Sequence, residues 1–177
     1  METHRAGADA MLDHPMLAAI SIRELLDSRA VLVPLTAVDR QGVLNELCDA
    51  LGGTGAVSDP EQLKKAVWER EQQRSTGIGE GLAFPHGKCS SVARPAIAVG
   101  RPSVPMDFGA IDRRPIRLIV LLASPPDRIT DHIQVLHLIS RIFSDAATRE
   151  RICLAPDPLT LRTELLAAES ALATRGT

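Results

Sequence analysis

Aromatic residues are scarce in this sequence, whose 177 residues include three Phe, one Trp and no Tyr. Proteins that bind single-stranded nucleic acid stack bases on aromatic side chains, so this composition disfavours that class of function. The formal net charge of -2 also gives no basic footprint for a phosphate backbone. We therefore expect no nucleic-acid partner, and a core built mainly from Leu, Ile, Val and Ala.

Long apolar runs are also missing. No stretch reaches the roughly 18 consecutive apolar residues that a membrane span needs. The N-terminus lacks the basic region followed by an apolar stretch that marks a secretory signal. Cysteine is limited to Cys48, Cys89 and Cys153, a scattered, odd set typical of reduced intracellular thiols. These absences predict a cytoplasmic protein with no direct membrane insertion.

The proportions of apolar and charged residues are typical of a globular protein. Apolar residues make up 45% of the chain and charged residues 24%, and the length fits one compact domain. Residues 1–18 are small and polar without a clear period, so we expect a flexible leader there. The domain is expected to span residues 19–172, with 173–177 as a C-terminal tail.

Helix starts are marked by capping residues, in two cases followed by proline at the first helical position. We predict that the helix beginning after Asp39 ends at Gly52–Gly53, because glycine is common at helix C-termini. The predicted starts lie at Ser21, Asp39, Asp59–Pro60, Thr130 or Asp131, Asp145 and Asp157–Pro158.

Strands are predicted between these helices. The run 116–123 is continuously apolar, which is typical of a buried strand, and 82–87 is a short strand broken by Pro85. Further strands are predicted at 30–35 and 96–99. Interleaved strands and helices predict one α/β domain with helices packed on a small central sheet. The pattern alone leaves open whether that sheet is parallel or mixed.

The segment 76–88 carries the candidate chemistry, and three phosphate-related motifs fail there or nearby. A Walker loop would need glycine at position 82, which is Leu82, and a hydroxyl residue at position 89, which is Cys89. The dinucleotide pattern also lacks its third glycine. The tripeptide at 107–109 spells a kinase motif, but the chain lacks the other kinase motifs.

With these motifs excluded, the candidate functional residue of the segment is His86, which lies between Pro85 and Gly87. Pro85 fixes the backbone just before the imidazole, and Gly87 is expected to let the chain turn away immediately after it. A histidine held this way suits a phosphoryl acceptor, because its ordinary pKa near 6.5 leaves a nucleophilic nitrogen at neutral pH.

A longer ordered pattern surrounds this histidine. It begins at Glu71, resumes after six residues with Ile78–Gly79, and ends with Leu82–Ala83–Phe84–Pro85–His86–Gly87. The pattern resembles the signature of type-2 IIA components of the bacterial sugar phosphotransferase system, the fructose and mannitol class. Phe84 departs from the family pattern, where an aliphatic residue is usual, and is expected to fill the same core position. Other segments similar to the family are 69–71, 108–112 and 132–136, so the likeness covers roughly residues 19–170.

The resemblance implies an α/β domain whose small mixed sheet is flanked by helices. It implies that His86 accepts a phosphoryl group from the histidine-containing phosphocarrier protein and passes it to a IIB component, without cofactor or metal. Arg70 matches the family's arginine near the active site, where its donors would neutralise phosphate oxygens. His132 matches a second family histidine, in the first turn of a helix, where the helix dipole favours an anion. Thr76 would offer a hydroxyl group.

Plainer interpretations stay open for these residues. His86 and His132 could be packing histidines, and Thr76 an ordinary loop residue. Arg70 could be a solvated residue on a helix surface of mixed charge. Because Cys89 lies three residues after His86, a small hydrolase that uses a Cys–His nucleophile pair stays an alternative. A zinc site is disfavoured, because no further cluster of Cys or carboxylate residues completes its ligands.

A second class of function is regulatory. In the nitrogen-related branch of the same family, the phosphorylation state of His86 would control binding to other proteins without sugar transport.

Overall fold

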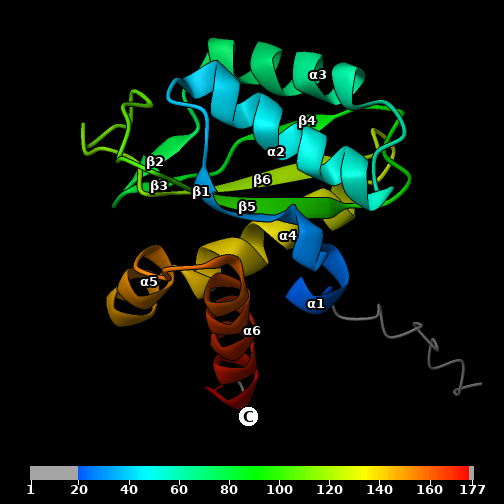
Figure 1. Ribbon diagram of the computed structural model, residues 1–177. Helices are drawn as coiled ribbons and strands as arrows, with labels where there is room; N and C mark the ends of the chain where they lie inside the picture. The colour runs from blue at the N-terminus through cyan, green and yellow to red at the C-terminus, as the bar shows by residue number, and fades with distance from the viewer. Residues whose placement is uncertain (1–19, 176–177) are drawn as a thin grey trace, which may run out of the picture.

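A six-stranded mixed sheet forms the centre of the computed structural model, which describes residues 20–175 (Figure 1). The strands are β1 (Val31–Leu35), β2 (Gly77–Gly79), β3 (Leu82–Ala83), β4 (His86–Lys88), β5 (Ala96–Pro102) and β6 (Leu118–Ser124). Their order is β1–β5–β6–β3–β2, and β4 also pairs with β6. The pairs β5–β6 and β2–β3 are antiparallel and the others parallel. The predicted α/β domain with a small mixed sheet is therefore confirmed.

Helices cover both faces of the sheet. Figure 1 shows α2 (Arg40–Thr54) and α3 (Pro60–Gln73) on one face, with the remaining helices on the other. Those helices are α1 (Ile22–Leu25), α4 (Ile129–Ile142), α5 (Ala146–Cys153) and α6 (Pro158–Arg175), and a 3-10 turn spans Ser28–Ala30. Within residues 20–175, no helix combines the length and apolar character needed to cross a membrane.

Side-chain caps begin most of these helices, as the sequence predicts. A side-chain oxygen of the capping residue accepts a hydrogen bond from the backbone N–H three positions later, which satisfies an otherwise unpaired donor. Ser21, Asp39, Asp59, Asp145 and Asp157 all do so. Helix α4 is the exception, because it begins at Ile129 without a side-chain cap.

The end of α2 differs from the prediction. The helix passes through Gly52–Gly53 and ends at Thr54, and its C-cap is Gly55, whose φ of 80° is left-handed. Gly52 has another role, because a Cβ built there would lie 2.4 Å from Cγ of Pro60 at the start of α3. The missing side chain lets α2 and α3 pack closely.

The predicted domain boundaries can be compared with the structure at the C-terminal end only. Residues 1–18, the expected leader, lie outside the described residues. Helix α6 continues through Arg175, so residues 173–175 are helical and extend beyond the expected domain end at 172. The division into leader, domain and tail stays a prediction.

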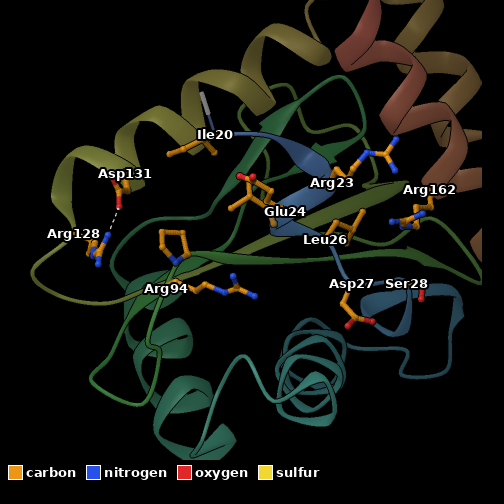
Figure 2. Close-up of a pocket in the computed structure, with 12 residues that line it drawn as sticks. Ile20, Arg23, Glu24, Leu26, Asp27, Ser28, Arg94, Arg128, Asp131 and Arg162 are labelled. Carbon is orange, nitrogen blue, oxygen red and sulfur yellow. Dashed lines mark hydrogen bonds and ion pairs between the residues drawn. The ribbon is translucent and has the colours of Figure 1, made fainter. Parts of the chain in front are cut away.

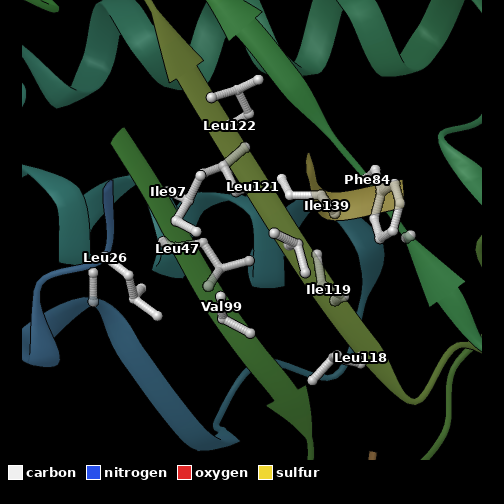
Figure 3. Close-up of a cluster of buried hydrophobic side chains, with 14 of the residues drawn as sticks. Leu26, Leu47, Phe84, Ile97, Val99, Leu118, Ile119, Leu121, Leu122 and Ile139 are labelled. Carbon is white, nitrogen blue, oxygen red and sulfur yellow. The ribbon is translucent and has the colours of Figure 1, made fainter. Parts of the chain in front are cut away.

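The core is centred on β6, whose seven residues are all buried. Figure 3 shows Leu121 and Leu122 of this strand among buried side chains from the neighbouring elements. Phe84 is buried among them and contacts the ring of Phe143 at a centroid distance of 5.7 Å, so it fills a core position as expected. Each such side chain contributes about 1.5–3 kcal/mol by leaving water. The short strands that pair with β6 are therefore held by a rigid element.

Candidate functional site

His86 is positioned by the central strand β6. Its strand β4 pairs in parallel with β6, with His86 opposite Leu122, and Leu122 N–H donates to the carbonyl of Pro85 at 2.9 Å. Gly87 does not turn the chain away, contrary to expectation, because β4 continues through Lys88. A Cβ on Gly87 would instead lie 2.7 Å from Cγ2 of Val67, so glycine is needed for close packing against α3.

The two ring nitrogens of His86 have different partners. Nδ1 lies 3.0 Å from the carbonyl oxygen of Phe84, which can only accept, so Nδ1 carries the proton. Nε of Arg70 lies 3.2 Å from Nε2 and can only donate, so Nε2 presents its lone pair. Partial burial lowers the pKa of His86 below 6.5, and the Phe84 carbonyl opposes this while Arg70 and Lys88 reinforce it. The ring is therefore neutral at pH 7, with a nucleophilic Nε2.

Arg70 lies on the last turn of α3, beside this nitrogen. Its Nη1 donates to the carbonyl oxygen of Arg74 at 3.0 Å, which holds the guanidinium group over His86. The structure thus brings together two residues that are 16 positions apart, as the resemblance implied. A guanidinium group carries five N–H donors, so these two bonds do not use all of them.

His132 is the second histidine at the site. Its ring lies edge-on to that of His86 at a centroid distance of 5.5 Å, and only 5% of the residue is exposed. Nδ1 of His132 shares a hydrogen bond of 2.9 Å with the buried hydroxyl of Ser124. Burial, followed by the charge of Lys88, lowers the pKa of His132 to about 4. The side chain is therefore a fixed neutral group at physiological pH.

Thr76 lines the pocket, but its hydroxyl is already committed. The hydroxyl and the backbone N–H of Thr76 both donate to the buried carboxylate of Glu71. Arg40 completes the network, with Nη1 3.4 Å from Glu71 Oε1 and 3.1 Å from the carbonyl oxygen of Phe108. These bonds hold the start of the loop that follows α3, and the expected role of Thr76 as a phosphate ligand stays a prediction.

A pocket of about 380 Å³ opens beside His86. Its wall combines Arg70 and Arg74 with the apolar side chains of Ile78, Phe84, Ile111 and Leu136. Two of these, Ile78 and Ile111, are 52% and 77% exposed, which is unusual for large aliphatic residues. A polar centre with an exposed apolar rim suits contact with another protein.

The structure does not support a Cys–His nucleophile pair. Cys89 is buried, and its Sγ lies 3.0 Å from the hydroxyl of Ser91. Among the described residues, the contacts recorded for the His86 ring are with Arg70, Phe84 and His132, and none is with Cys89.

Sequence reasoning missed three residues of the site. Glu71 was recognised as the start of the signature but without a role, and its burial depends on Thr76 and Arg40. Ser124 ends a strand that reads as uniformly apolar. Lys88 could have been found from the sequence, because residues two apart on a strand share a face. Lys88 therefore lies on the same face of β4 as His86. Its charge lowers the pKa of both histidines.

Comparison with known proteins identifies the family to which this sequence is similar. The family model described as "Phosphoenolpyruvate-dependent sugar phosphotransferase system, EIIA 2" matches residues 24–166. The fructose-specific EIIA component of Haloferax volcanii is 31% identical over 70% of this chain and 80% of its own length. The fructose-specific EIIABC component of Bacillus subtilis is 33% identical over 75% of this chain, which spans only 21% of that relative.

Solved structures share the fold. The nitrogen regulatory protein IIA-Ntr of Neisseria meningitidis superposes with a TM-score of 0.73 at 25% identity, over 80% of this chain and 97% of that one. IIA mannitol of Escherichia coli, solved in complex with phosphorylated IIB mannitol, gives a TM-score of 0.68 at 21% identity, over 82% and 97% of the two chains. With the match over residues 24–166, these findings show that the chain belongs to the EIIA 2 family of the phosphoenolpyruvate-dependent sugar phosphotransferase system.

Proposed function

We propose that this protein carries a phosphoryl group on Nε2 of His86, taking it from the histidine-containing phosphocarrier protein and passing it to a IIB component. The observation that carries the proposal is the pair of hydrogen bonds on this ring. One bond fixes the proton on Nδ1, and the other places a guanidinium donor 3.2 Å from the free lone pair.

The transfer balances without an added proton. The Nε2 lone pair attacks the phosphorus atom of the donor phosphohistidine, and the donor N–P bond breaks with its electron pair returning to the donor ring. The His86 ring keeps its Nδ1 proton and becomes positively charged, which the Phe84 carbonyl stabilises by accepting that proton's hydrogen bond. Most of the catalysis is then positioning and charge neutralisation.

Three neighbouring groups suit the incoming phosphoryl oxygens. Once Nε2 is bonded to phosphorus, Arg70 loses its acceptor there and its donors are free for the oxygens. Ser124 holds Nδ1 of His132, which leaves Nε2 of His132 as that ring's other polar atom. Lys88 adds positive charge on the same face of β4. These contacts support roles for Arg70 and His132 as phosphoryl-binding residues.

The apolar rim supports a protein as donor and acceptor. Ile78 and Ile111 flank the pocket and are exposed, so a partner that buries them would also exclude water from the phosphoryl group. Among the relatives, one is named as a joined EIIABC component and another structure is a complex with phosphorylated IIB. A IIB component is therefore the acceptor that we propose.

A nitrogen-type regulatory role is the second candidate. It is favoured by the likeness to the Neisseria protein named nitrogen regulatory protein IIA-Ntr, which this chain covers almost completely. The same phosphohistidine would then act as a switch for binding other proteins. Incubation of phosphorylated protein with candidate IIB components distinguishes the two, because only a transport component donates to one of them.

We also retain the cytoplasmic location. Cys48, Cys89 and Cys153 are all buried free thiols, which suits a reducing compartment.

The direct test is phosphorylation followed by intact mass spectrometry at neutral pH. The protein is mixed with phosphoenolpyruvate, magnesium, the first enzyme of the pathway and the phosphocarrier protein. We expect the gain of one acid-labile phosphoryl group, its loss in His86→Ala, and its retention in the control His137→Ala, which changes an exposed histidine.

Nitrogen-15 and phosphorus-31 NMR of the product then report which ring nitrogen is bonded. Phosphorylation of folded His86→Ala, or a product bonded through Nδ1, would contradict the proposed mechanism.

A further inference from the structure

A second, larger cavity lies away from His86. It has a volume of about 720 Å³, within the range of small-molecule sites, and none of the residues lining it lines the His86 pocket. Figure 2 shows it between α1, the start of α4, α6 and the segment that precedes β5. Nothing in the proposed phosphoryl transfer uses this cavity.

Four arginines from four separate segments line this cavity. They are Arg23 of α1, Arg94 before β5, Arg128 at the start of α4 and Arg162 of α6. In Figure 2, Arg23 and Arg162 lie toward one side of the view, Arg128 lies at the other, and Arg94 lies between them. Arg23, Arg94 and Arg128 are exposed and Arg162 is partly buried, so the cavity presents positive charge at the protein surface.

The acidic residues of the cavity do not balance these charges. Asp131 pairs with Arg128 at 3.3 Å, and Asp27 pairs with Arg29 outside the lining. The charge of Arg162 also lowers the pKa of Asp27, so Glu24 and Asp27 are the acids that remain near Arg23, Arg94 and Arg162. Among residues 20–175, none of these three guanidinium groups has a recorded hydrogen bond or ion pair.

Arg162 gives the second observation. Its Nε is buried, yet it has no hydrogen-bond partner in the described part of the chain. A buried donor left unsatisfied is costly and rare in native proteins, so it points to a missing acceptor. An anion that entered the cavity would supply acceptor oxygens to this group.

We propose that this cavity binds a small polyanion that carries at least two phosphate or carboxylate groups. Arginine suits both groups, because its planar fork of donors matches their paired oxygens. The spread of the four arginines around the cavity favours a ligand with separated anionic groups over a single phosphate. The proposal is independent of the role of His86.

The test uses the full chain at low ionic strength, with inorganic pyrophosphate and citrate as probes. Isothermal titration calorimetry measures affinity, and nitrogen-15 NMR shifts locate the site. We expect pyrophosphate or citrate to bind, with shifts at Arg94 and Arg162. Either Arg94→Gln or Arg162→Gln should weaken binding about tenfold or more. Binding of one probe alone supports the site and identifies the phosphate or the carboxylate as its anionic group.

Three controls make the result decisive. Arg141→Gln removes an exposed arginine elsewhere and should leave the affinity within about twofold. Arg70→Gln should also leave it unchanged, which separates this cavity from the phosphoryl pocket. Arg162→Lys should recover part of the loss, because the charge returns without the fork. The proposal is overturned if folded protein binds neither probe, or if Arg141→Gln weakens binding as much as Arg162→Gln.

Discussion

The His86 pocket and the arginine-lined cavity both contain cationic side chains, but these side chains differ in whether they have hydrogen-bond partners. Around His86, the main polar groups have partners: Arg70 donates to the imidazole, His132 bonds Ser124, and the carboxylate of Glu71 holds Thr76. Around the second cavity, three of the lining arginines (Arg23, Arg94 and Arg162) have no hydrogen bond or ion pair with the described residues.

The two regions therefore suit different tasks. Groups that are already hydrogen-bonded keep their geometry before a reaction, which lowers the cost of reorganisation when charge moves. In the second region, a ligand would gain most at Arg162, because its Nε is buried and has no hydrogen-bond partner in the described part of the chain. On this basis the first region is built for a transfer step and the second for binding.

Glu71 gives the largest expected effect on the paired region. Glu71→Ala leaves the N–H and hydroxyl of Thr76 without their acceptor and the charge of Arg40 without its partner. We expect the free energy of unfolding to fall by about 3 kcal/mol. Denaturant-induced unfolding measures this loss directly.

Glu69→Ala is the matched control for that substitution. Glu69 lies on the same helix, but its carboxylate is exposed and 4.0 Å from Lys65. Its removal should change stability by less than about 0.5 kcal/mol. Equal losses in the two variants would mean that the buried network around Glu71 adds nothing.

This network also marks the limit of what the sequence predicts. Local signals were sufficient for the helix starts at Asp39, Asp59 and Asp157, because a cap and its N–H partner are three residues apart. The signature was sufficient to place His86 and Arg70 together. The pairing of Glu71 with Arg40 joins two helices, and it could not be predicted because no sequence spacing indicates which residues of two different helices will meet.

Two glycines show the same limit. Gly52 and Gly87 were read as points where the chain ends a helix or turns. Both are instead places where a neighbouring element comes too close for a Cβ, Pro60 in one case and Val67 in the other. The sequence shows that a side chain is missing but not what occupies its space. The four arginines of the second cavity, spread over four segments, are unpredictable for the same reason.

Arg70 gives the next largest effect, on rate and not on stability. Arg70→Ala removes the donor at Nε2 of His86, so phosphoryl gain from the phosphocarrier should slow by about 100-fold. The free energy of unfolding should change little, because the guanidinium group lies at the surface of the site. Rapid-quench measurements of phosphoprotein formation, beside chemical denaturation, check both statements.

Two further variants separate charge from geometry at this position. Arg70→Lys should recover only part of the rate, because lysine restores the charge but not the fork. Arg141→Ala, on an exposed position of α4, should react at the normal rate. An unchanged rate in Arg70→Ala would remove this residue from the mechanism.

His132 makes stability depend on pH. Its folded pKa is about 4, below the ordinary 6.5, so between these values the unfolded chain binds a proton that the folded chain does not. Stability is therefore lost as pH falls from 6.5 toward 4, by an amount on the order of 2 kcal/mol by pH 4.5. His86, whose pKa is also lowered, adds to the loss in the same direction.

The variant His132→Gln should remove most of this slope, since glutamine does not titrate. Unfolding free energies measured at several pH values between 7 and 4.5 give the slope for each protein. His137→Gln, at an exposed position of the same helix, should keep the wild-type slope. If all three proteins lose stability in parallel, the acid sensitivity arises elsewhere.

Arg162 gives the smallest expected effect and the sharpest contrast with Glu71. Arg162→Met keeps the apolar stem, removes the buried Nε that has no partner in the described chain, and lowers the positive charge around the cavity. Without ligand, the free energy of unfolding should stay within about 0.5 kcal/mol of wild type or rise slightly. Thermal and denaturant unfolding in phosphate-free buffer test this. A loss near that of Glu71→Ala would show that Arg162 stabilises the folded chain, and the two regions would then no longer differ in kind.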